Sequence, residues 1–177
     1  MIGDVYLIMK KITFLITILL SLFILYAFIP KEDKTPKNIT LIKVYKKNRI
    51  LEVYEKDILF KTYKIALGKQ PLGHKHFEGD NKTPEGVYFI DGKNQYSAYH
   101  KNLGISYPNK RDVDYAKKKG KSAGGLIKIH GLPNGRGKIG KLHLLNDWTA
   151  GCIALTDKEI DEVYAATKVG VKIILYK

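Results

Sequence analysis

The chain has 177 residues, a length that suits one compact domain once its apolar N-terminal segment is set aside. Its net charge of +14, from 31 Lys and Arg against 17 Asp and Glu, predicts a surface that attracts anionic polymers or membranes. The lysines are scattered and no recognition-helix or zinc-finger pattern is present, so nucleic acid is not expected as a partner.

Residues 1–30 are predicted to form a membrane anchor or signal segment. Lys10 and Lys11 precede about 18 uncharged residues, from Ile12 to Ile29, enough for a helix that crosses a bilayer. The small-residue pattern of a cleavage site is missing before Pro30, which favours an anchor that stays attached. The two lysines place the N-terminus in the cytoplasm and the rest of the chain outside the cytoplasm.

The charged segment 31–38 is predicted to be a linker, and the folded domain is expected over 39–177. Three runs rich in Ile, Val and Tyr, at 39–46, 50–55 and 58–67, partly alternate between apolar and polar residues. Such alternation over short runs predicts an antiparallel meander of strands.

Two long polar stretches interrupt the strands that follow. One is Gly-rich and covers 68–86; the other follows a predicted strand at 87–90 and continues through Pro108. Irregular stretches of this length usually carry function. After a pair of glycines, residues 126–130 predict a buried strand that ends at His130.

Two helices are predicted in the second half of the chain. Asp112 is expected to cap a short helix that ends near Lys119. Thr156 and Glu159 form a capping-box pattern that starts a helix running to about Lys168. Gly170 is predicted to close this helix, and residues 171–176 are predicted to form a final strand. The expected fold class is mainly β with a few helices.

The chain contains a single cysteine, Cys152, so an intrachain disulfide is excluded. Cys152 follows Ala150 and Gly151 and precedes an apolar run, which predicts a tight, exposed turn. A glycine beside a nucleophile lets backbone approach closely, and the N–H groups of Gly151 and Cys152 are suited to bind an oxyanion. A cysteine that only fills space needs neither feature.

A thiol nucleophile also needs a base, and His130 is our first candidate. It ends a predicted strand, precedes Gly131 and lies 22 residues before Cys152. His143, nine residues before Cys152, is an alternative base or a substrate contact. Papain-like and NlpC-type peptidases place the cysteine before the histidine, so the order found here argues against both classes.

Two other site types receive weak support from the sequence. His74 and His76 form an H-x-H pair, which lacks the closed spacing of established zinc motifs. Further potential ligands of that metal site are Glu78, Asp80 and His100. Gly135, Gly137 and Gly140 match G-x-G-x-x-G, but no strand, helix and strand surround them, so no dinucleotide site is predicted.

Four segments in this order, GDNKTPEGVYFI, LGISYPN, IHGLPNG and DWTAGCIALTDKEIDEVY, resemble the YkuD-like catalytic domain of L,D-transpeptidases. The resemblance covers about residues 39–176 and implies a β-sandwich-like fold. It also implies Cys152 as nucleophile, His130 as base, a carbonyl at Gly131 that orients the imidazole, and an oxyanion site that includes the N–H of Gly151.

The chain departs from the common family motif at two positions. Many members have a histidine where Ala150 stands and an arginine or asparagine where Ala154 stands, whereas Thr149 matches the motif. The departures affect the expected substrate contacts and leave the base in place. Candidate substrate contacts are His143, Trp148, Thr149 and Tyr107.

The resemblance implies cysteine-dependent acyl transfer on peptidoglycan stem peptides through a Cys152 thioester. An amine acceptor gives an L,D-transpeptidase and water gives an L,D-carboxypeptidase; neither a metal nor an organic cofactor is needed. The expected location is a bacterial membrane, with the domain in the periplasm or cell wall. The alternative hypothesis is a non-catalytic cell-wall-binding domain that keeps the fold and has an unreactive Cys152.

Overall fold

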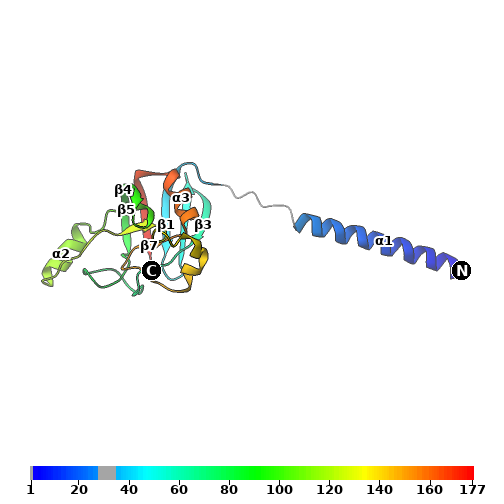
Figure 1. Ribbon diagram of the computed structural model, residues 1–177, viewed down its shortest axis with the longest axis horizontal. Coiled ribbons are helices and arrows are strands. Elements are labelled where there is room, and N and C mark those ends of the chain that lie inside the picture. The colour runs from blue at the N-terminus through cyan, green and yellow to red at the C-terminus, as the bar shows by residue number, and fades with distance from the viewer. Residues whose placement is uncertain (1, 28–34) are drawn as a thin grey trace. The chain divides into compact units, whose positions relative to one another are not determined.

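The computed structural model describes residues 2–27 and 35–177. Residues 31–34 of the predicted linker and residues 28–29 of the predicted membrane span lie outside the described residues. The chain divides between residues 34 and 35 into two compact units. Each unit is described by itself (Figure 1).

The N-terminal unit contains one helix, α1 (Ile2–Ala27). Its segment Leu7–Leu25 has 19 residues and a mean hydropathy of 2.2, and none of these residues is buried. Among the described residues this is the one helix with the length and composition of a membrane span. The helix begins at Ile2, before the start of the predicted span at Ile12, and includes Lys10 and Lys11.

Eight strands form the second unit. They are β1 (Ile39–Tyr45), β2 (Ile50–Glu55), β3 (Ile58–Lys64), β4 (Gly86–Ser97), β5 (His100–Ile105), β6 (Lys128–His130), β7 (Ile153–Ala154) and β8 (Thr167–Tyr176). Their order across the sheet is β3-β2-β1-β8-β4-β5-β6-β7. The first three strands pair antiparallel, so the predicted meander is confirmed.

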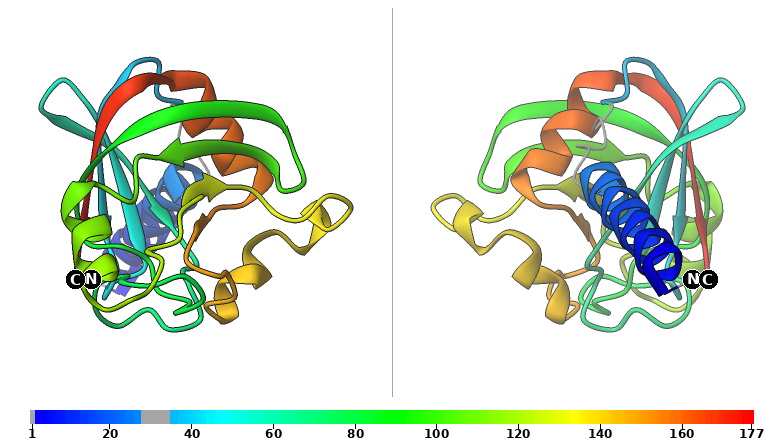
Figure 2. Two further views of the ribbon diagram at one scale, coloured as in Figure 1. Left: turned by 90° about the vertical axis from the view of Figure 1, so that its left-hand side faces the viewer. Right: turned by 90° about the vertical axis from the view of Figure 1, so that its right-hand side faces the viewer.

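The sheet curls at β4, because the two halves of this strand pair with different neighbours. Its first residues pair with β8 and its later ones with β5, with a register shift between Ile90 and Gly92. A backbone bridge from Ala66 to Ala154 then ties β7 to the segment that follows β3. The strands therefore wrap around a common core (Figure 2), and the predicted fold class, mainly β and sandwich-like, is confirmed.

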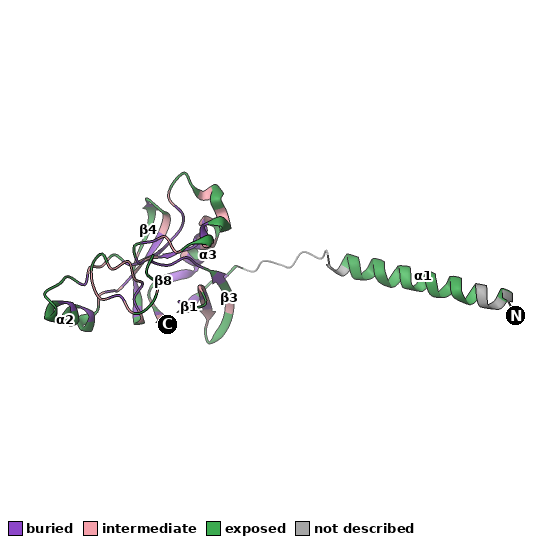
Figure 3. Ribbon diagram, turned by 90° about the horizontal axis from the view of Figure 1, so that it is seen from below, coloured by how far each residue is buried: buried purple, intermediate pink, exposed green. Residues whose placement is uncertain are grey.

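Apolar side chains from opposite parts of the sheet meet in this core. Ile42, Val44 and Leu51 are fully buried in the meander, and Ile160 and Val163 of helix α3 (Asp157–Ala166) close the core from one side. The cluster of buried apolar residues lies entirely within residues 39–175. Figure 3 shows buried residues concentrated on the strands of this unit, whereas the described side chains of α1 are exposed.

The prediction of an irregular stretch from 91 to 108 is wrong. β4 continues to Ser97 and turns into β5, so this stretch is mainly a hairpin. Most residues in the second half of β4 are polar and exposed, so they lack the apolar alternation that marks a half-buried strand.

Two helix boundaries also differ from the predictions. Asn109, and not Asp112, is the N-cap of α2 (Lys110–Lys118); Asp112 occupies the third position and completes the capping box. The box of Thr156 and Glu159 starts α3 as predicted, but α3 ends at Ala166 and the chain enters β8 at once. Gly170 therefore lies inside β8 and does not close the helix.

The segment before the cysteine contains a helix that was not predicted. It is the 3-10 helix η1 (Gly137–Leu145), which is interrupted at Gly140. The G-x-G-x-x-G match covers the turn before η1 and its first residues, away from any strand–turn–helix unit.

Candidate active site

A cavity of about 500 Å³ opens where β6, β7 and the β4–β5 hairpin meet. Cys152 and His130 both line it, together with Trp148 and Thr149. The other lining residues are Lys69, Asn94, Tyr96, Ser97, Ala98, Tyr99, Asn102, Leu126, Lys128 and Ala150. The lining carries two lysines and no carboxylate, so the cavity favours an anionic ligand.

Strand pairing brings Cys152 and His130 together. β6 and β7 run parallel, and His130 lies opposite Ala154 in the register. Cys152 immediately precedes β7, and its side chain lines the same cavity as that of His130. The end of β6 and the turn before β7 thus bring to one cavity two residues that lie 22 positions apart in the chain.

His130 is held in one orientation by its backbone neighbour and by aromatic rings. Its Nδ1 donates to the Gly131 carbonyl over 2.7 Å, so its Nε2 carries the lone pair when the ring is neutral. The ring centroids of Tyr99 and Trp148 lie 4.7 and 5.7 Å from that of His130. This carbonyl contact is the one that the family resemblance implied.

Gly131 has little room for a larger residue. A Cβ at this position would lie 2.7 Å from Asp157 Oδ1 and 3.0 Å from Ile160 Cγ2. The same Asp157 oxygen accepts the N–H of Leu132 over 2.8 Å. The start of α3 therefore packs against the segment that orients the imidazole.

Thr149 pins the turn that carries Cys152. Its hydroxyl donates to the Cys152 carbonyl over 2.7 Å and accepts the Gly151 N–H over 3.1 Å. Its own backbone pairs with Leu67 and Lys69. Thr149 is buried, so it organises the turn, while the Gly151 N–H predicted for the oxyanion site is engaged by this hydroxyl.

Burial shifts the pKa values of the two candidate catalytic groups in opposite directions. It raises the pKa of the Cys152 thiol above its ordinary value. The backbone N–H of Lys128 and the positive charges of Lys128 and Lys75 act in the opposite direction. Burial lowers the pKa of His130 below its ordinary value, opposed by the hydrogen bond to Gly131. The resting pair is therefore a thiol and a neutral imidazole, and the thiol points to the Leu126 carbonyl at 3.6 Å.

The structure places His143 apart from this cavity. His143 is buried against a second cavity of about 310 Å³, which shares Trp148 with the first. Its Nδ1 accepts the Trp148 indole N–H over 3.4 Å, and its Nε2 has no partner within the described part of the chain. Burial lowers the pKa of His143. His143 thus contacts Trp148 at the second cavity, whereas His130 lines the cavity that contains Cys152.

Tyr107 is also outside the cavity lining. It is buried in the core, and its hydroxyl donates to the Ala123 carbonyl over 3.1 Å. The predicted contacts that do line the cavity with Cys152 are Trp148 and Thr149.

The histidines weighed as metal ligands have other partners. His74 accepts the Glu85 N–H and contacts Asp112 at 3.1 Å, and His100 contacts Asp161 at 2.8 Å. Within residues 2–27 and 35–177, no group of three or more His, Cys, Asp or Glu side chains is arranged to hold a metal ion.

The sequence did not identify the hairpin side of the cavity. Tyr96 is 86% exposed and Tyr99 is 40% exposed, and both stand on the cavity wall about 50 residues before Cys152 in the chain. Exposed tyrosines among polar residues were the one available signal, because large exposed aromatic side chains often mark binding surfaces.

A family model of the L,D-transpeptidase catalytic domain, YkuD, matches residues 39–175. The chain is 31% identical over 130 residues to the putative L,D-transpeptidase YafK of Escherichia coli strain K12, covering 70% of this chain and 45% of YafK. It spans about half the length of the relatives it matches.

Solved structures of similar fold agree with this match. The helical cell shape determining protein Pgp2 of Campylobacter jejuni is 29% identical, with a TM-score of 0.59 over 80% of this chain and 49% of Pgp2. Bd1075 of Bdellovibrio bacteriovorus is 23% identical, with a TM-score of 0.55 over 79% of this chain and 48% of Bd1075. The second likeness concerns the fold alone.

Proposed function

Since the chain belongs to the L,D-transpeptidase catalytic domain family, we propose that it transfers acyl groups from peptidoglycan stem peptides through a thioester at Cys152. The observation that carries the proposal is that His130, at the end of β6, and Cys152, immediately before β7, line one cavity. The hydrogen bond from Nδ1 of His130 to Gly131 leaves Nε2 free to accept a proton.

The first half-reaction forms the thioester. Nε2 of His130 takes the thiol proton as Cys152 Sγ attacks the carbonyl carbon of the third stem residue, and the carbonyl π electrons move to oxygen. The N–H groups of Cys152 and Gly151 stabilise the oxyanion, the latter once the substrate oxygen competes with the Thr149 hydroxyl. The C–N bond then breaks, and the imidazolium protonates the departing amine of the terminal D-amino acid.

The second half-reaction returns the enzyme. An amine of another stem peptide loses a proton to His130, attacks the thioester carbonyl and displaces the Cys152 thiolate, which regains the proton. Water in place of the amine gives a shortened stem, which is the L,D-carboxypeptidase outcome. Thiol, imidazole and backbone donors supply every group for these steps, so we propose a mechanism without a cofactor.

We further propose that α1 anchors the domain on the extracytoplasmic face of a bacterial membrane. The apolar segment Leu7–Leu25 supports an anchor, and the lysines at its start favour a cytoplasmic N-terminus. The net positive charge suits an anionic cell wall.

The first test is the intact mass of the full chain after exposure to a carbapenem, whose strained lactam is an acyl donor for thiols. We expect one acyl adduct on the wild type, none on Cys152→Ala and much slower formation on His130→Ala. His143→Gln is the matched control and should acylate at about the wild-type rate. A wild type that forms no adduct and leaves tetrapeptide stems intact would contradict the enzyme and favour the non-catalytic wall-binding domain.

A further inference from the structure

The 3-10 helix η1 presents apolar side chains on the surface of the domain. Ile139, Leu142 and Leu145 are 39%, 66% and 77% exposed. Residues three apart lie above one another in a 3-10 helix, because it has three residues per turn. Leu142 and Leu145, which both follow the interruption at Gly140, therefore form one apolar stripe. Exposed apolar side chains grouped in this way mark interaction surfaces.

The stripe borders a groove beside the candidate active site. Ile139, Leu142 and Leu145 all line the second cavity, whose volume is about 310 Å³, and Trp148 lines it as well. Trp148 also lines the cavity that contains Cys152. A partner that covers the groove would therefore lie next to the candidate active site.

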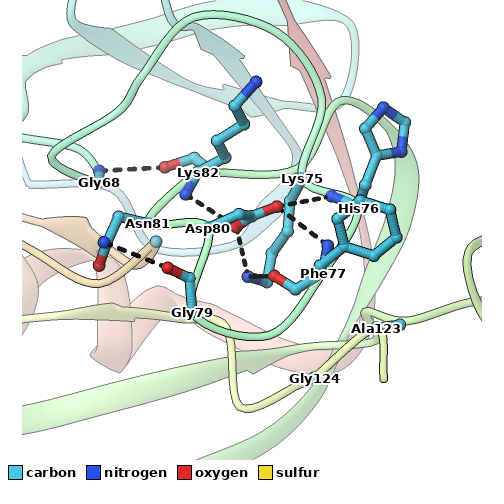
Figure 4. Close-up of polar contacts among 12 residues, drawn as sticks. Gly68, Lys75, His76, Phe77, Gly79, Asp80, Asn81, Lys82, Ala123 and Gly124 are labelled. Atoms are coloured by element: carbon cyan, nitrogen blue, oxygen red, sulfur yellow. Dashed lines mark hydrogen bonds and ion pairs between the residues drawn. The ribbon is translucent and has the colours of Figure 1, made fainter. Parts of the chain in front are cut away.

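Basic side chains alternate with the apolar ones along this segment. Arg136, Lys138 and Lys141 are all exposed. A cation that serves the fold is held differently: the buried ammonium of Lys75 contacts Asp80 Oδ1 at 2.8 Å (Figure 4). The exposed cations of η1 and its N-cap remain available to an anionic partner.

Neighbouring carboxylates do not offset these charges. The sequence from 135 to 146 contains no Asp or Glu. Asp147, which follows, pairs with Arg49 at 2.7 Å, and Asp157 accepts the N–H of Leu132 over 2.8 Å. The segment therefore combines three positive charges with an apolar stripe.

An anionic lipid bilayer matches both features of this surface. Lipid phosphates can pair with the cations, and the acyl region can take up the leucines. An anionic wall polymer would leave the leucines in water, and a second copy of the chain would bring like charges together.

The length of the chain supports a lipid partner. Residues 28–38 join α1 to β1, and a chain of that length reaches at most about 40 Å even when fully extended. With α1 in a bilayer, the domain stays within reach of the lipid headgroups.

We propose that η1 is a docking surface for an anionic bilayer, in which Leu142 and Leu145 enter the lipid and Arg136, Lys138 and Lys141 bind its phosphates. This inference goes beyond acyl transfer and rests on the proposed anchor, which keeps the domain near a membrane.

The test is the fluorescence of Trp148, the single tryptophan of the chain, with the full chain inserted in lipid nanodiscs. Bromine on the acyl chains quenches a tryptophan that touches the lipid. We expect strong quenching in discs of brominated phosphatidylglycerol and little quenching in discs of brominated phosphatidylcholine. In 1 M salt, quenching in the anionic discs should fall to the level of the neutral discs, because the charges are screened.

Two double variants separate the contributions of charge and apolar contact. Lys138→Gln/Lys141→Gln should lower the ratio of docked to free domain about fivefold for each lysine removed. Leu142→Ser/Leu145→Ser should lower it about tenfold, because two leucines lose their burial in lipid. All four residues are exposed, and if the serine variant does not fold, the glutamine variant decides the test alone.

The matched controls lie at β3. Lys56→Gln/Lys64→Gln removes the same charge from two other exposed lysines, and Ile58→Ser/Leu59→Ser removes two other exposed apolar side chains. Both control variants should keep the wild-type quenching. Equal quenching in the two lipids, or an equal loss in control and η1 variants, would overturn the proposal. A groove covered by wall polymer or by a second copy would show no quenching in either lipid and would overturn it as well.

Failure of the anchor is seen separately. A full chain that does not copurify with phosphatidylcholine discs would contradict α1 as an anchor, whereas a chain that copurifies with both discs and is quenched in neither would contradict docking alone. Quenching needs no reaction at Cys152, so the carbapenem adduct tests the enzyme independently.

Discussion

At the scale of single residues, the protonation states of Cys152 and His130 determine how the proposed reaction can start. Burial favours the neutral form of each, so a preformed thiolate–imidazolium pair is disfavoured in the resting protein. In the proposed mechanism the proton then moves as the thiol attacks, which requires Nε2 of His130 to be unprotonated. The hydrogen bond from Nδ1 to Gly131 selects the tautomer that leaves Nε2 available.

This arrangement predicts the acid limb of the pH profile. The pKa of His130 lies below its ordinary value of 6.5, so the imidazole remains neutral at pH 7 and gains a proton only as the pH falls through that lowered value. We expect the rate constant of carbapenem acylation to stay level from pH 7.5 to about pH 6.5 and to fall at lower pH. Rapid-mixing measurements of acylation would check this; a fall that starts above pH 7 would contradict it.

A substitution at Gly151 tests whether its close contact with the backbone of Lys82, in the loop between β3 and β4, matters for the reactivity of Cys152. Its φ of +133° strains any larger residue, and a Cβ would meet the Lys82 carbonyl at 2.6 Å. We expect Gly151→Ala to cost about 1–3 kcal/mol of unfolding free energy from backbone strain alone, and to slow alkylation of Cys152. Thermal unfolding and iodoacetamide kinetics measure the two effects.

Gly135→Ala is the control for the Gly151 variant. Gly135 also has a positive φ, +81°, but a Cβ there would meet nothing within 4 Å. It should lose stability through strain and keep the wild-type alkylation rate at equal folded fraction. Slow alkylation in both variants would show that the contact with Lys82 is not the cause.

At the scale of elements, local patterns predicted the strands and helices whose signals are local. Alternation gave β1, β2 and β3, and the reciprocal capping by Thr156 and Glu159 gave the start of α3. The second half of β4 was missed because its exposed polar residues are ordered by pairing with β5, a contact that periodicity does not record.

The candidate site was likewise predictable only where its residues carry a local signal in the sequence. Cys152 and His130 stand at sequence signals, a small-residue turn and a strand end, and pairing of β6 with β7 brings them to one cavity. The walls were not predictable, because Tyr96 and Tyr99 reach the cavity through a hairpin that the sequence did not reveal. Tyr107, the tyrosine that was predicted as a substrate contact, is instead buried in the core.

At the scale of the whole molecule, the curled sheet builds the cavity from segments far apart in the chain. The loop after β3, the β4–β5 hairpin, β6 and the turn before β7 each supply part of the wall or floor. The bridge between Ala66 and Ala154 closes this arrangement. A cavity built from so many segments depends on the complete fold, so the domain should keep its site only as a whole.

The last prediction concerns the two units. The apolar core lies within residues 39–175, so a chain of residues 35–177 should fold alone and keep the rate at which iodoacetamide alkylates Cys152 in the full chain. In bacterial cells the full chain should stay in the membrane pellet after washing with 1 M salt and with alkaline carbonate, because the helical segment Leu7–Leu25, with a mean hydropathy of 2.2, holds it there.

The domain of residues 35–177 is the control, since nearly all of the net charge of +14 remains on it. Its residual membrane binding should disappear in 1 M salt, where the screening length falls to about 3 Å. Release of the full chain by salt would mean that charge, and not α1, holds the protein at the membrane. A full chain found shortened by its first segment would instead identify α1 as a cleaved signal, because an anchor must remain joined to the domain to hold it.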